Sequence, residues 1–388
     1  MRWRDAMDGA LYGPGGFFVS SGGPADHFRT SVHASPLFAS CLLRVLAALD
    51  SALGHPARLD VVDVGAGRGE LLRALVALAG VGGSGEPTRS GRSGLIPPRA
   101  GSPEPLPLAH RLRLTAVEVA PRPVDLPPGI GWVAEVPAGI TGLLLATEWL
   151  DNVPLDVAVP AEDGWRYVLV DPATGEEAVG DRVSAADAGW LAAWWPGTDA
   201  PTVTGSGFRA ARPAEGSSLT ARSRSGCPET PTATGTRAEI GRTRDEAWAE
   251  AVGHLDRGLA LAVDYGHLRE DRPVGGSLAG YRGGRQVPPV PDGSCDVTAH
   301  VAFDAVAAAG AAVAGCAYTL VSQREALRAL GADGARPPLS LAAADPAGYV
   351  RALAAASAVA ELTDPAGLGG HRWLLQPVGV AADALMAR

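Results

Sequence analysis

The chain has 388 residues, 46% of them hydrophobic, and a formal net charge of −9. This length is enough for two or three average domains, or for one enlarged α/β domain with insertions. The acidic balance argues against a nucleic-acid-binding surface, which normally has a basic footprint. All 33 cations are arginine and Asn152 is the only asparagine, a bias that indicates a GC-rich genome rather than a function.

The cysteines and the hydrophobic pattern bear on the compartment. The four cysteines have neither metal-ligand spacing nor disulfide density, so we expect reduced thiols and no metal site. No apolar stretch of about 18 residues predicts a membrane span. The first residues also lack the apolar core of a signal peptide. These features together predict a cytoplasmic protein.

Residues 1–55 are expected to form an N-terminal arm. A short helix candidate precedes a turn flanked by aromatic residues, Tyr12 to Phe18. A helix is predicted from Pro36 to Leu53, with Ser35 as its N-cap and the proline at its first position. The arm precedes the first strand of the core and could fold over a ligand pocket as a lid, or it could simply pack against the core.

A strand–loop–helix pattern follows at residues 59–75. The apolar run from Leu59 to Val64 predicts a buried parallel strand, and leucines at helical spacing follow it. Between them lie Gly65, Gly67 and Gly69, which allow positive φ and close approach of a ligand to the backbone. The helix N-terminus adds free N–H groups and a positive dipole. This pattern predicts a nucleotide-binding loop, although a tight glycine turn without a ligand is the alternative.

The spacing of the glycines indicates which nucleotide. A dinucleotide fingerprint would need a third glycine where Glu70 stands, and a P-loop would need a lysine. Here Asp63 precedes a G-x-G-x-G pattern, and a carboxylate suits a ligand that carries an ammonium and a sulfonium. The segment resembles motif I of the class I S-adenosylmethionine (SAM) methyltransferases. The expected cofactor-binding residues of this loop are Asp63, Gly65, Ala66, Gly67 and Gly69.

Two further strands are predicted beyond a Gly- and Pro-rich segment at 80–108, which we expect to be a flexible insertion. The strand at 111–118 ends in Glu118, where an acid can accept hydrogen bonds from the ribose hydroxyls of a nucleotide. Another strand is predicted at 131–135. The buried strand at 142–147 then ends in an acidic loop, Glu148 to Pro154, which should face the same crevice as the glycine loop.

The remaining elements complete the predicted sheet. A substrate-facing insertion is expected at 155–240, with a strand at 165–170 and a disordered part at about 198–237. A helix at 240–255, a buried strand at 258–266 and a polar loop at 282–291 follow. The tail predicts strands at 312–319 and 373–380 and helices at 324–330 and 346–361. We therefore predict an α/β fold, a doubly wound Rossmann-like sheet spanning residues 56–388.

The order of these motifs resembles one family, the MidA-type methyltransferases, which are relatives of the mitochondrial complex I assembly arginine methyltransferase. The resemblance runs from about residue 7 to residue 380 and rests on YGPGGFF, DHFRTS, VDVGAGRGEL, VEVAPR, ATEWLDNVP, AVDYG, SLAGYR and DVTAHV. The chain departs from the family at Thr147, where the family usually has asparagine, at Asp63-Val64, where it has Glu-Leu, and at Ala25, where it has glycine. These departures bear on the details of the pocket.

The resemblance implies SAM as cofactor and, at least in the mitochondrial branch, a protein substrate that presents an arginine, for example on a respiratory-complex subunit. It adds Thr30 and Ser31 of DHFRTS to the cofactor site and leaves a homodimer open. Two other classes remain: a small-molecule O- or N-methyltransferase, and a SAM-binding assembly factor without essential catalysis.

The acidic loop is the expected catalytic segment. Glu148 and Asp151 could hold a planar guanidinium in a fork and receive its proton, with Asn152 beside them. The alternative role of Asp151 is to cap a following helix. Asp264 and Tyr265 could line the far wall of the pocket, and His300 is either a base or a structural residue.

Overall fold

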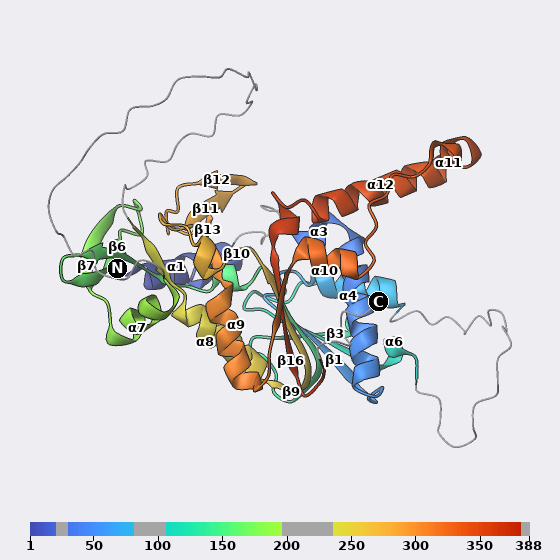
Figure 1. Cartoon of the computed structure of the whole chain (residues 1–388), viewed down its shortest axis with the longest axis horizontal. Coiled ribbons are helices and arrows are strands. Elements are labelled where there is room, and N and C mark those ends of the chain that lie inside the picture. Colours follow the sequence, from blue (N-terminus) through green and yellow to red (C-terminus); the bar gives the residue numbers. More distant parts are fainter. Residues whose placement is uncertain (21–29, 81–105, 196–235, 382–388) are drawn as a thin grey trace.

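The computed structural model describes residues 1–20, 30–80, 106–195 and 236–381 (Figure 1). Within these residues a seven-stranded sheet forms the centre of the molecule. From one edge to the other its strands are β3 (Ile130–Val133), β2 (Leu112–Val117), β1 (Leu59–Val64), β4 (Ile140–Thr147), β9 (Leu255–Asp264), β16 (Arg372–Val378) and β15 (Thr319–Ser322). The five strands from β3 to β9 pair in parallel, whereas β16 pairs antiparallel with both β9 and β15.

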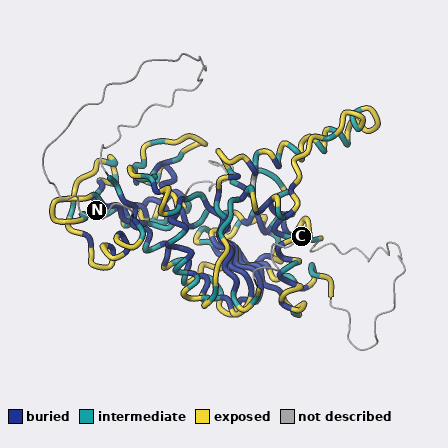
Figure 2. Tube along the Cα trace, viewed as in Figure 1, coloured by how far each residue is buried: buried dark blue, intermediate teal, exposed yellow. Residues whose placement is uncertain are grey.

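Helices cover both faces of this sheet. All six residues of β1 are buried, and successive side chains point to opposite faces. Leu59 and Val61 join the core under one set of helices, and Val62 and Val64 join the core under the other. The first set is α4 (Pro36–Ala52), α5 (Glu70–Ala79), α10 (Gln323–Ala329) and α12 (Pro346–Leu362), and the second is α8 (Arg242–Gly253) and α9 (Phe303–Ala314). Figure 2 shows the central strands as buried along most of their length, as strands covered on both faces must be.

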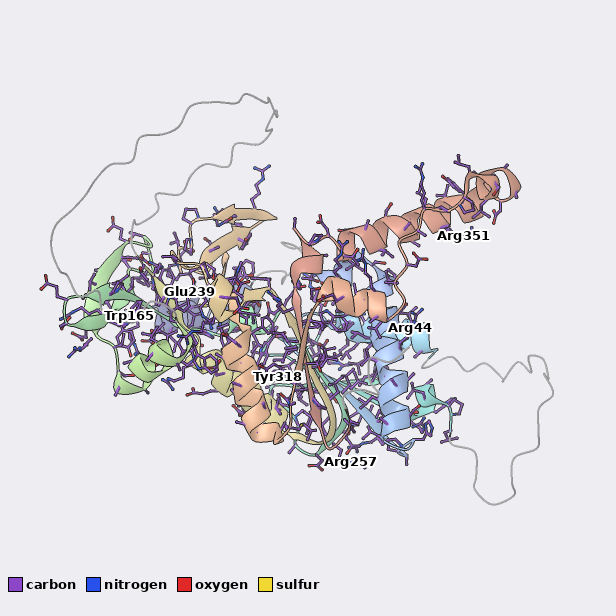
Figure 3. The ribbon with its side chains drawn as sticks, in the orientation of Figure 1. Arg44, Trp165, Glu239, Arg257, Tyr318 and Arg351 are labelled. Carbon is purple, nitrogen blue, oxygen red and sulfur yellow. The ribbon has the colours of Figure 1, made fainter. Side chains whose placement is uncertain are left out.

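A smaller antiparallel sheet lies beside the central one. It contains β7 (Glu177–Arg182), β6 (Gly164–Val170), β5 (Asp156–Ala161) and β8 (Ala238–Ile240), and the helix α7 (Ala185–Trp194) packs against it. The N-terminal helix α1 (Trp3–Tyr12) buries Trp3, Met7 and Leu11 against β5 and β6. Trp165 and Glu239 mark this half of the molecule in Figure 3, and Arg44 marks the opposite half.

The short elements between these layers connect them. A three-stranded sheet of β12 (Arg285–Val287), β11 (Ala279–Arg282) and β13 (Asp296–Thr298) lies next to α1, and β10 (Gly266–His267) pairs with β14 (Val301–Ala302). The remaining short helices are α2 (Phe17–Ser20), α3 (Ser31–Ala34) and α6 (Leu108–Arg111).

One helical pair projects from the body. The helix α11 (Leu339–Ala344) packs against α12, and the two extend away from the sheet (Figure 1). Asp345 caps α12 by accepting a hydrogen bond from the Gly348 N–H, as its position before the proline predicts. Most of the pair is exposed, and Arg351 lies on it in Figure 3.

The predicted doubly wound α/β fold is confirmed, with two differences in its later part. The strand predicted at 312–319 is wrong, because α9 continues to Ala314 and ends at Gly315 with φ 66° before β15 begins at Thr319. The alanine-rich run around residue 312 is short and apolar, and periodicity alone cannot separate a helix from a strand there. The polar loop predicted at 282–291 contains β12, which forms a hairpin with β11.

The predicted insertions lie mostly outside the described residues. Of the segment 80–108, the structure describes Gly80 and residues 106–108, and of 198–237 it describes residues 236 and 237. The described part of 155–240 forms the smaller sheet.

Candidate functional site

A cavity of about 1430 Å³ opens beyond the carboxyl ends of β1, β2 and β4. Ligands of open α/β sheets bind at this edge. Of the predicted site residues, those that line the cavity are Thr30, Gly65, Gly67, Glu118, Glu148, Asp151, Asn152 and Tyr265, and His300 lines it too. The predicted residues Ser31, Asp63, Ala66, Gly69 and Asp264 do not line it. They lie next to lining residues in the chain, and their predicted roles stay predictions.

The glycine loop connects β1 to α5 in the way the sequence predicts. Gly65, Gly67 and Gly69 have φ of 69°, 57° and 77°, values that other residues rarely adopt. The N–H groups of Gly65 and Ala66 donate to the carbonyl of Val117 at 3.0 and 3.3 Å, which fixes the loop against β2. Gly65 also lies against the indole of Trp149, since a Cβ at this position would be 2.8 Å from Trp149 Cδ1. The loop therefore contacts the acidic loop directly.

Glu118 at the end of β2 joins the glycine loop to the cavity wall. Its carboxylate accepts hydrogen bonds from the N–H groups of Gly67 at 3.0 Å, Val119 at 2.7 Å and Ala120 at 3.1 Å. Burial raises the pKa of Glu118, and these backbone donors partly oppose the increase. The carboxylate is thus held at the rim of the glycine loop, where the ribose of a nucleotide is expected.

Asp63 lies one layer deeper, near the end of β1. Its side chain is buried, and its Oδ1 has no hydrogen-bond partner among the described residues. Burial raises the pKa of Asp63 to about 8, and the negative charges of Glu70 and Glu118 contribute. A cation bound in the loop would oppose this shift.

The acidic loop begins with a strained residue. Glu148 has a positive φ of 51°, an unusual conformation for a residue with a Cβ and one that is common at functional sites. Its N–H donates to the carbonyl of Val263 at 2.8 Å, and its Oε1 accepts from the N–H of Ser31 at 3.1 Å. Ser31 is fully buried, and its N–H holds the Glu148 carboxylate in place.

Asp151 is the most enclosed acid of the cavity wall. It belongs to a 3-10 turn, Leu150–Asn152, and its side chain caps no helix. Its Oδ2 accepts hydrogen bonds from the hydroxyl of Tyr265 and, at 2.7 Å, from that of Thr298. Its Oδ1 is buried without a hydrogen-bond partner in the described part of the chain. Burial raises the pKa of Asp151, while the two hydroxyls and the Arg244 guanidinium favour its charged form.

Arg244 of α8 holds the loops of the site together. Its guanidinium is buried and donates to the carbonyls of Val153 at 3.0 Å, Ala299 at 2.8 Å and His300 at 3.1 Å, and to that of Asp151. These bonds join the segment after β4 to the segment after β13. The positive charge also remains close to Asp151, where it stabilises the carboxylate.

Asp264 acts behind the cavity. It is fully buried at the end of β9, and its two oxygens accept from the N–H groups of Asp151 at 3.2 Å and Tyr265 at 2.9 Å. Burial raises its pKa well above the usual range, and the charge of Asp151 adds to the increase. The contacts of Asp264 are those of a residue that orients the loop.

A second acid, Asp296, closes the cavity on the side of α1. Its Oδ1 accepts a hydrogen bond from the side-chain amide of Asn152 at 2.7 Å. The hydroxyl of Tyr12 donates to the carbonyl of Asn152 at 3.2 Å. Tyr12, Tyr281, Asn152 and Asp296 all line the cavity. The only asparagine of the chain thus orients a buried acid.

Tyr265 stands between two imidazoles. Its ring centroid lies 5.2 Å from that of His300 and 5.6 Å from that of His371. His300 is exposed and lines the cavity, whereas His371 is buried and burial lowers its pKa to about 4. His300 therefore contacts the ring of Tyr265 and also lines the cavity, and its position fits both of the roles predicted for it.

Several residues of the site were not identified from the sequence. Tyr12, Tyr281, Asp296 and Thr298 belong to the motifs YGPGGFF, SLAGYR and DVTAHV, which therefore held a usable signal. Arg244 belongs to no motif. The inserted region at 155–240 has no described residue at the cavity and reaches it through α1, which packs on β5 and β6.

Comparison with known proteins assigns the family. The family described as "Putative S-adenosyl-L-methionine-dependent methyltransferase" matches residues 111–321, more than half of the chain. The chain belongs to this family. The predicted SAM-dependent methyltransferase is confirmed at this level, and SAM is the cofactor of the family.

Two solved structures share the fold of this methyltransferase. One is a COG1565 superfamily member from Burkholderia thailandensis bound to S-adenosyl-homocysteine, with 22% identity, a TM-score of 0.67 and coverage of 99% of this chain and 90% of that one. The other is a native crystal structure of a COG1565 superfamily protein from the same organism, with 22% identity, a TM-score of 0.67 and coverage of 100% and 90%. No curated protein matches the chain.

In the part of the chain that the structure describes, no helix is both long and apolar enough to cross a membrane. In the same part of the chain, no group of three or more His, Cys, Asp or Glu residues could hold a metal ion.

Proposed function

We propose that this methyltransferase transfers a methyl group from SAM to the guanidinium of an arginine in a protein client. The observation that carries the proposal is the position of Asp151, a buried carboxylate in the wall of the same cavity that the glycine loop and Glu118 line. One end of the cavity thus suits the nucleotide, and the other end suits a cationic acceptor.

The size of the cavity supports two ligands. Sites for one drug-sized molecule usually have volumes of about 300–1,000 Å³, and this cavity has about 1430 Å³. The residues that would hold SAM are those of the loop Gly65–Gly69 together with Glu118. Gly67 fits this role because, among the described residues, a Cβ there would have only Glu70 as a neighbour within 4 Å.

The charge of the wall supports a cationic acceptor. Glu148, Asp151 and Asp296 line the cavity from two different segments, and aromatic rings of Tyr12 and Tyr281 lie on the same wall. Carboxylates bind a planar guanidinium through paired hydrogen bonds, and aromatic faces attract cations. A neutral hydroxyl acceptor would not require this number of acids.

The chemistry that we propose depends on position. SAM, when bound, supplies an electrophilic methyl group. Glu148 and Asp151 would orient the guanidinium so that one nitrogen faces that methyl group, and either acid could receive the proton that the nitrogen loses. Holding two reactants in line supplies much of the rate of such a reaction.

From the sequence we further propose that the protein is a MidA-type enzyme, that its client is a protein such as a respiratory-complex subunit, and that it is cytoplasmic. We also propose that an N-terminal arm, residues 1–55, closes over the ligands. The positions of Tyr12, Phe18, Val19 and Thr30 at the cavity support the arm. The exposed apolar residues Leu339, Val350 and Leu353 of the projecting helices support a homodimer, which sedimentation would test.

Two measurements test the proposed function. Calorimetry should show binding of SAM and S-adenosyl-homocysteine but not of NAD. Transfer from methyl-labelled SAM to lysate proteins of a strain that lacks this chain should then label arginine. Neutralising either acid, Glu148→Gln or Asp151→Asn, should preserve SAM affinity and decrease transfer about ten- to hundredfold, since a hydrogen bond to a charged group contributes about 1.5–3 kcal/mol.

The outcomes separate the alternatives. Rapid turnover of a small acceptor without arginine would indicate a small-molecule methyltransferase. SAM binding with no methylated product would indicate an assembly factor. Wild-type transfer by the double variant of Glu148 and Asp151 would remove the acidic loop from catalysis.

A further inference from the structure

The two oxygens of the Asp151 carboxylate have different environments. Oδ2 accepts from two hydroxyls, those of Tyr265 and Thr298, whose oxygens lie 2.6 Å apart. Oδ1 is buried and has no hydrogen-bond partner among the described residues. A buried acceptor without a hydrogen-bond donor destabilises the fold, and in a cavity wall a bound ligand can supply that donor.

The geometry explains how this difference arises. Thr298 comes from β13 and Tyr265 from the end of β9, so two separate elements converge on one oxygen of the 3-10 turn. Thr298 is buried and the hydroxyl has no freedom to turn to solvent. With Oδ2 held on this side, rotation of the carboxylate is blocked and Oδ1 keeps one position.

We propose that Thr298 is a positioning residue that, together with Tyr265, holds Asp151 so that Oδ1 is the acceptor for one N–H of the substrate cation. This inference rests on the proposed function and deepens it. In the transfer, the acceptor nitrogen forms a bond to the methyl carbon as the carbon–sulfur bond breaks, and its N–H proton passes to Oδ1 and then to solvent. S-adenosyl-homocysteine leaves with the electron pair of the broken bond.

Charged and titratable groups surround this carboxylate on several elements. They are Tyr12 of α1, Arg244 of α8, Asp264 and Tyr265 at the end of β9, Tyr281 of β11, Asp296 of β13 and His300 after it. Tyr265, through its hydrogen bond, and Arg244, through its charge, favour the charged form of Asp151, and the neighbouring acids oppose it. The hydroxyl of Thr298 adds to the effect of Arg244, because it donates to the charged carboxylate and lowers the pKa of Asp151.

The experiment uses the full chain saturated with S-adenosyl-homocysteine and N-acetylarginine amide as the probe, with its affinity measured by calorimetry. Thr298→Val, which keeps the shape and removes the hydroxyl, should weaken probe binding about ten- to hundredfold, and Thr298→Ser should restore it. Affinity for S-adenosyl-homocysteine should stay within about twofold of the wild-type value. Thr363→Val is the matched control, since the buried hydroxyl of Thr363 donates to the Val359 carbonyl far from the cavity.

A pH series adds a readout that loss of packing would not produce. Probe binding needs the charged carboxylate, so affinity falls as the pH falls through the pKa of Asp151. Since the Thr298 hydroxyl lowers this pKa, the fall should begin at a higher pH in Thr298→Val than in the wild type. If Thr298→Val does not fold, Tyr265→Phe removes the other donor and should shift the fall in the same direction.

Equal affinity and equal pH dependence in Thr298→Val and the wild type would overturn the inference and leave the proposed function intact. Failure of the wild type to bind the probe, with S-adenosyl-homocysteine bound normally, would also overturn it. Failure to bind S-adenosyl-homocysteine at all would instead contradict the proposed function.

Discussion

The contact between Gly65 and Trp149 makes a demanding test of the site geometry. Gly65→Ala places a residue with a Cβ at φ 69°, which costs about 1–2 kcal/mol. The new Cβ would lie 2.8 Å from Trp149 Cδ1, so either the glycine loop or the indole must move. Such overpacking costs a further 1–3 kcal/mol, roughly. We expect Gly65→Ala to lower the free energy of unfolding by about 2–5 kcal/mol.

The chain offers a matched control at the other end of α5. Gly80 has nearly the same φ, 68°, but a Cβ there would meet no atom of the described residues within 4 Å. Gly80→Ala should therefore lose only the conformational part, about 1–2 kcal/mol, and keep its SAM affinity. Urea unfolding measures the stability of each variant, and calorimetry should show SAM affinity reduced at least about tenfold in Gly65→Ala alone.

A double substitution decides whether the indole is responsible. In a Trp149→Ala background the 2.8 Å contact with Cδ1 is absent and only the 3.2 Å contact with the Cβ of residue 149 remains, so the added cost of Gly65→Ala should fall most of the way to that of Gly80→Ala. The same added cost in both backgrounds, or equal SAM affinity in the two glycine variants, would refute the reasoning.

Three further predictions concern acids and the N-terminal arm. Glu118→Gln should weaken SAM binding about ten- to hundredfold in calorimetry, because a charged acceptor for the ribose is lost. Asp50→Asn should lower the free energy of unfolding in urea by about 3–5 kcal/mol, because Arg111 stays buried without its partner at 2.6 Å. The hydrogen bond from Arg111 lowers the pKa of Asp50, so this stability is complete at neutral pH and is lost as the pH falls below about 4. Tyr12→Phe should preserve SAM affinity and weaken binding of an arginine probe about two- to tenfold, because its hydroxyl no longer holds the Asn152 carbonyl.

Exposed acids supply the controls for these variants. Glu246→Gln removes a carboxylate that pairs with Arg242 on the surface of α8 and should not change SAM binding. Asp163→Asn breaks an exposed pair with Arg166 and should not change the unfolding midpoint measurably. A similar loss in Asp163→Asn and Asp50→Asn would mean that burial of the Arg111 pair has no special weight.

Local patterns in the sequence predicted the part of the fold that depends on local physics. The apolar, valine-rich run of β1, the glycines after it and the caps of α4 and α12 each express a constraint within a few residues. Glu118 could be placed because a strand end is recognisable even when a long insertion precedes it. By contrast, the run around residue 312 was misassigned because alanine fits a helix as well as its apolar neighbours fit a strand.

The site residues that could not be predicted depend on contacts between distant segments of the chain. Arg244 lies on a helix whose sequence gives no sign that its guanidinium will be buried among four carbonyls. Thr298 and Asp151 are far apart in the chain, and only the packing of β13 against the turn after β4 brings them together. Tyr12 similarly reaches the cavity because α1 rests on the smaller sheet.

The core under α4 has a consequence for the order in which the protein can fold. Phe38 of α4 packs edge-on against Trp373 of β16, with ring centroids 5.8 Å apart, and both belong to the same apolar cluster. Phe38, on one of the first helices to leave the ribosome, thus meets this aromatic partner only when one of the last strands has been made, although α5 and β4 pack against the same helix earlier. The core under α4 is therefore incomplete through nearly the whole of translation. A ribosome that stalls before residue 372 would release a chain prone to aggregation.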